Sequence, residues 1–235
     1  MISVVLASYN GEKYIKRQID SIIIQLGAND ELIISDDGST DRTLDIVREM
    51  SKNDSRIKVI NGPRKGYNKN FENAINYACG DYIFISDQDD IWLPNKVSCI
   101  ISEFIKNPSI MCIRHDCKVI DDNGNVLIES YNDFRKSNTN YRKNIIKNTF
   151  TGCCMCVKRE WINKLLPFPD GIFYDCWIGT MSCKHNNVMI INDKLIEWCR
   201  HEGTVTNAKK RNSIFWIIKD RVRLYKNIKK RCKNI

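Results

Sequence analysis

The first hundred residues alternate between two hydrophobic patterns, and this alternation restricts the possible folds more than any other feature. Apolar runs typical of buried strands lie at residues 2–10, 31–37, 56–62 and 81–86. The segments between them carry apolar residues at helical spacing, at residues 12–25, 38–50 and 68–78. Repeated strand-helix-strand units predict an α/β fold whose mostly parallel central sheet has helices on both faces.

Polar residues stand directly after several of these predicted strands. Ser8 and Tyr9 follow the first strand, and Asp36 and Asp37 follow the second. The carboxyl ends of parallel strands meet at one edge of the sheet, where ligands bind in open α/β folds. We therefore expect these side chains to line one rim, together with the polar residues that end the fourth strand.

The fourth strand ends in the sequence FISDQDDIW, residues 84–92, where three carboxylates occupy four positions. Asp87, Asp89 and Asp90 would repel one another without a counter-charge. An EF-hand loop is excluded because its glycine position holds Trp92, and a glycosidase pair is excluded because its carboxylates flank the sugar from opposite sides. Mg²⁺ or Mn²⁺ shared with substrate phosphates fits better. Capping of the next helix, which is expected to start at a proline, explains Asp90 alone.

The pattern changes after residue 105. Residues 121–126 predict a hairpin turn, residues 148–157 an apolar strand and residues 158–166 a helix. Cys153 and Cys156 form one CxxC without a second pair at zinc-finger spacing, so they are interpreted as buried thiols. The chain has 11 Cys at irregular spacing, no apolar run near 20 residues and no signal-peptide pattern, which favours a cytosolic protein with reduced thiols.

The formal net charge of +9 arises at the end of the chain. Residues 209–235 hold eleven basic residues and one acid, and their apolar residues recur at helical spacing. We predict one domain at residues 1–208 and a basic amphipathic helix at residues 209–235. The helix either lies on an anionic membrane surface or docks on its own domain, and nucleic acid is not expected because no aromatic platform accompanies the charge.

Several motifs together resemble family 2 of the glycosyltransferases, the inverting enzymes with the Rossmann-like GT-A fold. They stand in the family's order within residues 2–207: VVLASYNGEKYIKRQIDSI, IISDDGSTDRT, GDYIFISDQDDIWLPNK, TGCCMCVKREW, FYDCW and RHEGTVTN. The segment DQDDIWLP is similar to bacterial enzymes that build polysaccharide, often described as rhamnosyl- or galactosyltransferases. The resemblance implies a nucleotide-sugar donor.

The resemblance also implies roles for residues near the donor. Tyr9 is expected to stack on the uracil or thymine ring, and Asp37 to hydrogen-bond the base. Ser8 is counted with these donor-binding residues, and Asp87, the first aspartate of the DxD motif, is expected to reach the ribose. Asp36 is expected to be structural.

Three further residues are assigned to metal binding and catalysis by the same resemblance. Asp89 is expected to bind the metal ion, with His201 completing the metal or diphosphate site, and Asp175 is expected to act as the general base. Asp90 is expected to orient the loop. Two structural readings stay open: Asp175 as a helix N-cap, and His201 in a surface ion pair with Glu202.

The remaining tryptophan and histidine candidates have structural interpretations. Trp92 and Trp177 are candidates for sugar contacts or for the hydrophobic floor of a cleft. His115 and His185 have no partner pattern and are interpreted as structural.

The expected function is a metal-dependent inverting glycosyltransferase with Mn²⁺ or Mg²⁺. It would move a sugar from a UDP- or dTDP-sugar to a hydroxyl of a glycan or lipid-linked glycan in bacterial surface polysaccharide synthesis. We expect it in the cytoplasm, peripheral on the inner face of the cell membrane through residues 209–235. A sugar nucleotidyltransferase is disfavoured because SYNGEKY is not a Gly-rich basic loop. A non-catalytic nucleotide-binding protein recruited to membranes by its tail is the other alternative.

Overall fold

The computed structural model describes residues 1–201, 214–233 and 235. In this part of the chain one mixed sheet has the strand order β3-β2-β1-β4-β8-β6-β9-β5, with β7 beside β6. Its first half is parallel and is formed by β1 (Ile2–Ser8), β2 (Glu31–Asp36), β3 (Ile57–Asn61) and β4 (Tyr82–Ser86). Because Ser8 pairs with Asp36 in the register, the carboxyl ends of β1 and β2 lie at the same rim.

The second half of the sheet contains the antiparallel pairs. β8 (Met155–Lys158) lies antiparallel between β4 and β6 (Cys112–Asp121), whereas β9 (Val188–Arg200) runs parallel to β6. The short strand β5 (Ile91–Trp92) pairs with β9, and β7 (Val126–Ile128) pairs with β6. The long strand β9 therefore returns the chain to the segment that follows β4.

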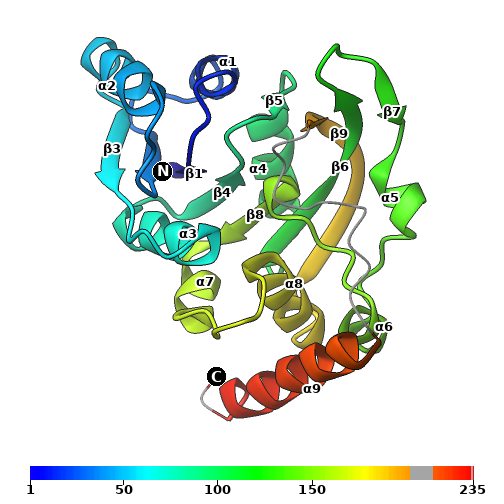
Figure 1. Ribbon diagram of the computed structural model, residues 1–235. Helices are drawn as coiled ribbons and strands as arrows, with labels where there is room; N and C mark the ends of the chain where they lie inside the picture. The colour runs from blue at the N-terminus through cyan, green and yellow to red at the C-terminus, as the bar shows by residue number, and fades with distance from the viewer. Residues whose placement is uncertain (202–213, 234) are drawn as a thin grey trace.

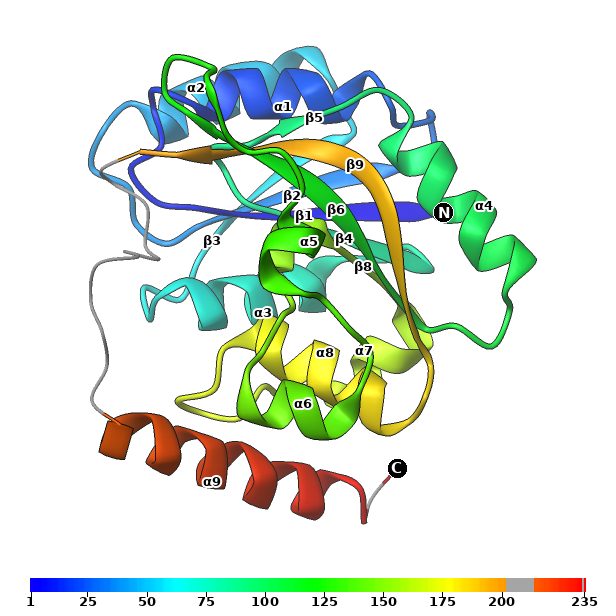
Figure 2. The same ribbon diagram turned by 90° about the vertical axis from the view of Figure 1, so that its right-hand side faces the viewer.

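Helices cover both faces of the sheet, as predicted (Figure 2). One face carries α1 (Ile15–Ile23), α2 (Thr43–Asn53) and α4 (Lys96–Lys106). The opposite face carries α3 (Tyr67–Tyr77), α7 (Arg159–Leu165) and α8 (Tyr174–Lys184). Strand residues alternate between two cores: Val4 and Leu6 lie with the α1 side, and Val5 with the α3 side.

The predicted hairpin joins β6 to β7. Asp121 N donates to Asn125 O at 3.0 Å, and Gly124 has a φ of +83°, a conformation that glycine adopts without a steric penalty. The turn lies next to the amino end of α1, because the Tyr14 hydroxyl donates to Asp122 Oδ1 at 2.8 Å.

Other local predictions were wrong in detail. Helix α4 begins at Lys96 after the N-cap Asn95, so Pro94 lies outside the helix and is not its first residue. The strand expected at residues 148–157 begins only at Met155, after a 3₁₀ turn at Gly152–Cys154. Strands β5 and β9 had no counterpart in the sequence prediction, and of β6 and β7 only the turn that joins them was predicted.

The last described helix, α9 (Ile214–Arg231), lies against α8 and α6 (Tyr141–Ile146) on the outside of the domain (Figure 1). Leu224 and Ile228 of α9 are buried in the same core as α8. Residues 209–213 and 234 of the predicted tail lie outside the described residues. None of the helices seen in the described segments is long and apolar enough to cross a membrane.

A short helix, α5 (Tyr131–Arg135), precedes α6.

Candidate active site

The rim at the ends of β1 and β2 is held together by Asp36. Its carboxylate accepts hydrogen bonds from Ser8 Oγ at 2.9 Å, Ser39 N at 2.8 Å and Gly38 N at 3.1 Å. Asp36 is therefore structural, as expected. The Ser8 hydroxyl is buried and is engaged with Asp36.

Tyr9 and Asp37, the residues assigned to the donor base, follow the same two strands. The Tyr9 side chain is 57% exposed at the rim. The Asp37 carboxylate accepts from Gly66 N at 2.8 Å and from Lys65 N at 3.3 Å, which holds the loop before α3. The rim thus presents an exposed aromatic ring after β1 and, after β2, a carboxylate that backbone hydrogen bonds hold in place.

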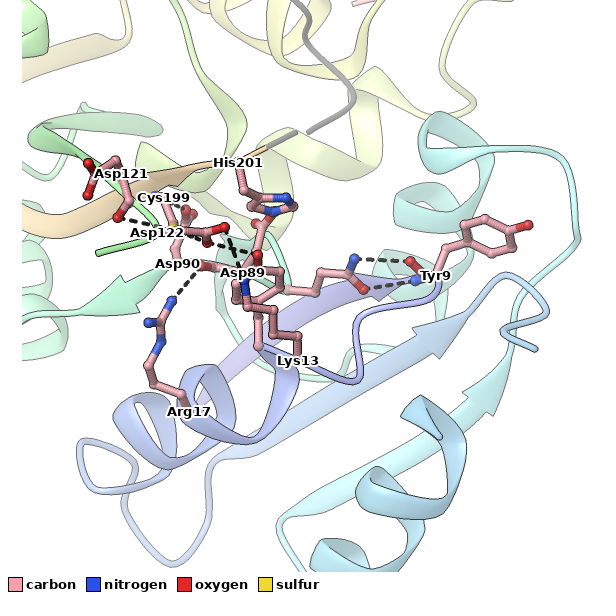
Figure 3. Close-up of polar contacts among 11 residues, drawn as sticks. Tyr9, Lys13, Arg17, Asp89, Asp90, Asp121, Asp122, Cys199 and His201 are labelled. Atoms are coloured by element: carbon pink, nitrogen blue, oxygen red, sulfur yellow. Dashed lines mark hydrogen bonds and ion pairs between the residues drawn. The ribbon is translucent and has the colours of Figure 1, made fainter. Parts of the chain in front are cut away.

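Gln88, the middle residue of the DxD motif, joins the loop after β4 to the loop after β1. Gln88 Oε1 accepts from Tyr9 N at 2.9 Å, and Gln88 Nε2 donates to Tyr9 O at 3.0 Å (Figure 3). Arg17 of α1 donates to Asp89 O at 3.1 Å. A Cβ atom at Gly11 would overlap the Gln88 amide, so Gly11 leaves the space for it. The sequence analysis did not single out Gln88 or Arg17, because no local sequence pattern indicates hydrogen bonds to residues more than 70 positions away.

Asp89 and His201 meet at this rim. His201 Nε2 lies 2.9 Å from Asp89 Oδ2, although the residues are 112 positions apart, and both side chains are largely buried. The ring of Tyr14 stacks on His201 with centroids 4.4 Å apart, and Lys13 and Tyr14 both bond Asp122 in the β6-β7 turn (Figure 3). β9 delivers His201 to the DxD loop. Glu202, the alternative partner, lies outside the described residues.

A second group of possible ligand atoms lies behind this pair. Asp87, Asp90 and Cys153 each place one such atom within 4.8 Å of the others. Asp90 is fully buried; its Oδ1 accepts from Cys199 N at 3.2 Å, and its Oδ2 has no hydrogen-bond partner among the described residues. Asp90 does not cap α4, so the capping interpretation was wrong. Its contact with β9 orients the loop.

The electrostatics of this region favour a positive charge. Burial raises the pKa of Asp87, and the negative charges of Asp89 and Asp175 raise it further. Burial and the negative charges of Asp89 and Asp87 also raise the pKa of Asp90 well above its ordinary value. Carboxylate oxygens that share a crowded site, one of them unpartnered, fit a hard divalent cation. The Cys153 sulfur is a softer ligand and suits Mn²⁺ or Mg²⁺ less well.

Lys96 is a buried cation near these carboxylates that sequence reasoning missed. Its Nζ donates to Cys153 O at 3.0 Å and lies 3.9 Å from the centre of the Trp92 ring. Burial lowers the pKa of Lys96 to about 8, while nearby thiols and Asp90 act in the opposite direction. Lys96 ties α4 to the turn before β8 and offsets part of the negative charge.

Asp175 approaches the carboxylates from a separate segment, the first turn of α8. Phe173 is the N-cap of this helix, so the N-cap interpretation of Asp175 was wrong. Asp175 Oδ1 accepts from Cys176 N at 2.6 Å, and burial raises the pKa of Asp175 to about 6. A carboxylate with this pKa is ionised at neutral pH and still basic enough to accept a proton.

Other polar and aromatic candidates belong to the core. Trp92 and Trp177 are buried in the hydrophobic cores, and Trp177 Nε1 donates to Leu165 O at 3.0 Å. His115 is fully buried, and burial lowers its pKa to about 3, which keeps the imidazole neutral. It is structural, as expected.

Comparisons with known sequences agree with this arrangement. A model of glycosyl transferase family 2 matches residues 3–166. Over 195 residues the chain is 35% identical to the Escherichia coli protein named UDP-Glc:alpha-D-GlcNAc-diphosphoundecaprenol beta-1,3-glucosyltransferase WfgD, covering 82% of this chain and 73% of the relative. It is also 35% identical to the Escherichia coli chondroitin synthase over 132 residues, 56% of this chain but only 19% of that protein.

Solved structures show the same fold. Staphylococcal TarS 1–349 in complex with UDP-GlcNAc superimposes with a TM-score of 0.74 at 20% identity, covering 98% of this chain and 66% of that one. The mannosyltransferase PcManGT from Pyrobaculum calidifontis, in complex with GDP-Man and Mn²⁺, has a TM-score of 0.61 at 19% identity, covering 82% and 54%. The GT-A fold is thus confirmed. Since the family match spans well over half of the sequence, this chain belongs to glycosyl transferase family 2 and is a glycosyltransferase.

Proposed function

We propose that the chain is a metal-dependent inverting glycosyltransferase that transfers a sugar from a nucleoside-diphosphate sugar to a hydroxyl of a glycan or lipid-linked glycan. One observation carries this proposal. The Asp89-His201 pair stands at the sheet rim beside Asp87, and Asp175 approaches Asp87 from helix α8. The residues assigned to the donor and the residue assigned as the base thus come from different segments, which suits groups that act on opposite sides of one sugar.

The donor is a UDP- or dTDP-sugar. Tyr9 stacks on the base, Asp37 and Ser8 support the base-binding rim, and Asp87 bonds the ribose. The exposure of the Tyr9 ring and the ordering of the Asp37 loop support this assignment. UDP is favoured because one relative is named for UDP-Glc and the TarS structure contains UDP-GlcNAc.

Asp89 Oδ2 and His201 Nε2 would hold the divalent cation, Mn²⁺ or Mg²⁺, next to the crowded carboxylates of Asp87 and Asp90. One carboxylate oxygen and one imidazole nitrogen leave positions for diphosphate oxygens and water, and Mn²⁺ accepts this ligand set. The cation, when bound, would neutralise negative charge on the departing diphosphate. The Mn²⁺ in the PcManGT complex supports a metal in this fold.

Asp175 is the general base. It removes the proton from the acceptor hydroxyl while the hydroxyl oxygen bonds the anomeric carbon and the bond from that carbon to the diphosphate oxygen breaks. The configuration at this carbon inverts because the acceptor enters opposite the leaving group. The products are the glycosylated acceptor, a nucleoside diphosphate and Asp175 carrying the proton of the acceptor hydroxyl.

The acceptor is a glycan or lipid-linked glycan of a bacterial surface polysaccharide. The relative named for a diphosphoundecaprenol-linked substrate supports a lipid-linked acceptor. A lipid carrier would place the enzyme in the cytoplasm at the inner face of the membrane, with residues 209–235 on its anionic surface.

Calorimetric titration of UDP, dTDP and GDP, with and without Mn²⁺, tests the donor site. We expect Mn²⁺-dependent UDP binding that Asp89→Ala abolishes. Asp20→Ala is the matched control, because Asp20 is a carboxylate on the surface of α1, paired with Lys16. Absence of binding to all three nucleotides by folded protein contradicts the proposal. Binding without transfer to any lipid-linked acceptor favours the non-catalytic alternative.

A further inference from the structure

Helix α9 presents two apolar faces, and the domain covers one of them. Leu224 and Ile228 are each 1% exposed and are buried in the core beside α8. Ile218, Val222 and Tyr225 follow one another at spacings of four and three residues, so they form a separate stripe, and they are 57%, 46% and 43% exposed. Docking on the domain therefore leaves a second apolar face open to solvent.

The open stripe continues onto α6. Ile146, the last residue of α6, is 73% exposed. Between the two helices lies a groove of about 380 Å³, and its lining is almost entirely apolar: Ile145, Ile146, Ile217, Ile218, Arg221, Val222 and Tyr225. We call these seven residues the α6-α9 patch. An exposed apolar groove with a polar rim is a candidate binding site for a protein or a lipid.

Cations border the patch on both sides. From α6 and the residue after it come the exposed side chains of Arg142, Lys143 and Lys147. From α9 come exposed basic side chains at five positions: Lys219, Arg223, Lys226, Lys229 and Lys230. The single acid within α9, Asp220, is 17% exposed and lies 3.7 Å from Arg221, so it offsets little of this charge.

We propose that the α6-α9 patch binds the surface of an anionic lipid bilayer. The apolar side chains enter the boundary between headgroups and acyl chains, and the flanking Lys and Arg side chains contact lipid phosphates. A second copy of the chain is a poorer occupant, because a symmetric contact through this patch would bring the two cationic borders together.

The inference deepens the proposed membrane location by adding α6 to the surface and by assigning separate faces of α9 to the domain and to lipid. The inference rests on the proposed function only in taking the enzyme to work at the membrane. Its test measures lipid binding, so it can fail while the transfer reaction stands, and the reaction can fail while lipid binding stands.

The test is sedimentation of the full chain with vesicles of phosphatidylcholine alone or mixed with phosphatidylglycerol. We expect binding to the mixed vesicles that weakens with salt, and little binding to phosphatidylcholine alone. The double variant Ile146→Glu, Val222→Glu should bind the mixed vesicles at least about tenfold more weakly, since two carboxylates would enter the interface. The matched control is Ile24→Glu, Ile105→Glu, because these side chains are 77% and 68% exposed elsewhere on the surface. The control should bind like the unaltered chain.

All four substituted side chains are exposed, so we expect melting temperatures close to that of the unaltered chain, and circular dichroism checks this. Equal vesicle binding by the double variant and the unaltered chain overturns the proposal. So does an equal loss in the control variant. A dimer of the unaltered chain in light scattering, converted to monomer by the double variant alone, would instead identify the patch as an interface between copies.

Discussion

The side-chain amide of Gln88 bonds both backbone polar groups of Tyr9, accepting from its N at 2.9 Å and donating to its O at 3.0 Å. This pair of bonds joins the loop after β4 to the loop after β1. The two aspartates on either side of Gln88 are therefore held at a fixed position relative to the donor-base rim. The middle residue of the DxD motif is a positioning residue in this chain.

Gln88→Glu should weaken UDP binding in the presence of Mn²⁺. Glutamate keeps the shape and can accept from Tyr9 N, but it cannot donate to Tyr9 O and adds a negative charge beside Asp87 and Asp89. Loss of one hydrogen bond costs about 0.5 to 1.5 kcal/mol, and the added charge opposes the donor diphosphate, so we expect UDP affinity to fall about tenfold in calorimetry.

Gln25→Glu is the control for this substitution. Gln25 also bonds backbone groups, accepting from Val97 N at 3.3 Å and donating to Leu93 O and Ser21 O at 3.1 Å each, but it ties α1 to the segment around α4. It should lower the melting temperature and leave UDP affinity unchanged. Equal UDP affinities of the two variants would show that Gln88 does not position the donor site.

His201→Gln should reduce Mn²⁺ affinity. The substitution removes the imidazole nitrogen that lies 2.9 Å from Asp89 Oδ2 while retaining a polar side chain. We expect at least a tenfold loss, about 1.4 kcal/mol, in Mn²⁺ titrations followed by electron paramagnetic resonance. The matched control is His185→Gln, since His185 packs against Trp161 on the other side of the domain. Mn²⁺ binding that is unchanged in His201→Gln would remove His201 from the metal site.

The order of elements up to β4 was predictable because its signals are local. Each strand is a short apolar run, each helix shows a 3.6-residue period, and turn residues separate them. Most of strand β6 was missed because its buried residues include Arg114, His115 and Asp116, whose polarity hides the apolar pattern on both faces of the strand. Strand β9 was missed because Lys194 and Glu197 interrupt its apolar residues.

The candidate site was predictable in a similar, partial way. Residues at strand ends were placed correctly, because parallel topology alone brings those ends together. The contact between Asp89 and His201 depends on β9 pairing with β5 and β6, and no local pattern encodes such long-range pairing. The hydrogen bonds between Gln88 and Tyr9 likewise depend on how close the loops after β4 and β1 lie in the folded protein.

The rate of transfer should depend on the ionisation of Asp175. Burial raises the pKa of Asp175 to about 6, and the base must be ionised to accept the acceptor proton. The value of kcat/KM should therefore be constant above about pH 7 and fall tenfold per pH unit well below pH 6. Asp175→Asn should lower kcat by about 10²- to 10⁴-fold and change donor affinity little. A kcat for Asp175→Asn near that of the unaltered enzyme would exclude this base.

The same carboxylate should lower the stability of the folded protein at neutral pH. Its pKa in the folded state, about 6, lies above the ordinary value of 3.8, so protonated Asp175 is favoured by folding and ionised Asp175 is disfavoured. The stability associated with the protonated form is fully present below pH 3.8 and is lost as the pH rises through 6. Asparagine carries no charge at any pH, and its side-chain oxygen can still accept from Cys176 N.

Asp175→Asn should therefore raise the free energy of unfolding at pH 8 by about 1 to 3 kcal/mol, since each pKa unit corresponds to about 1.4 kcal/mol. The gain should shrink as the pH falls and vanish near pH 4, which urea denaturation at several pH values measures. Asp170→Asn should show no such gain, because the Asp170 side chain is 91% exposed. A gain confined to Asp175→Asn means that folding free energy is given up to keep a basic carboxylate in the site. A loss of stability at pH 8 would instead show that the Asp175 charge is compensated in the folded protein.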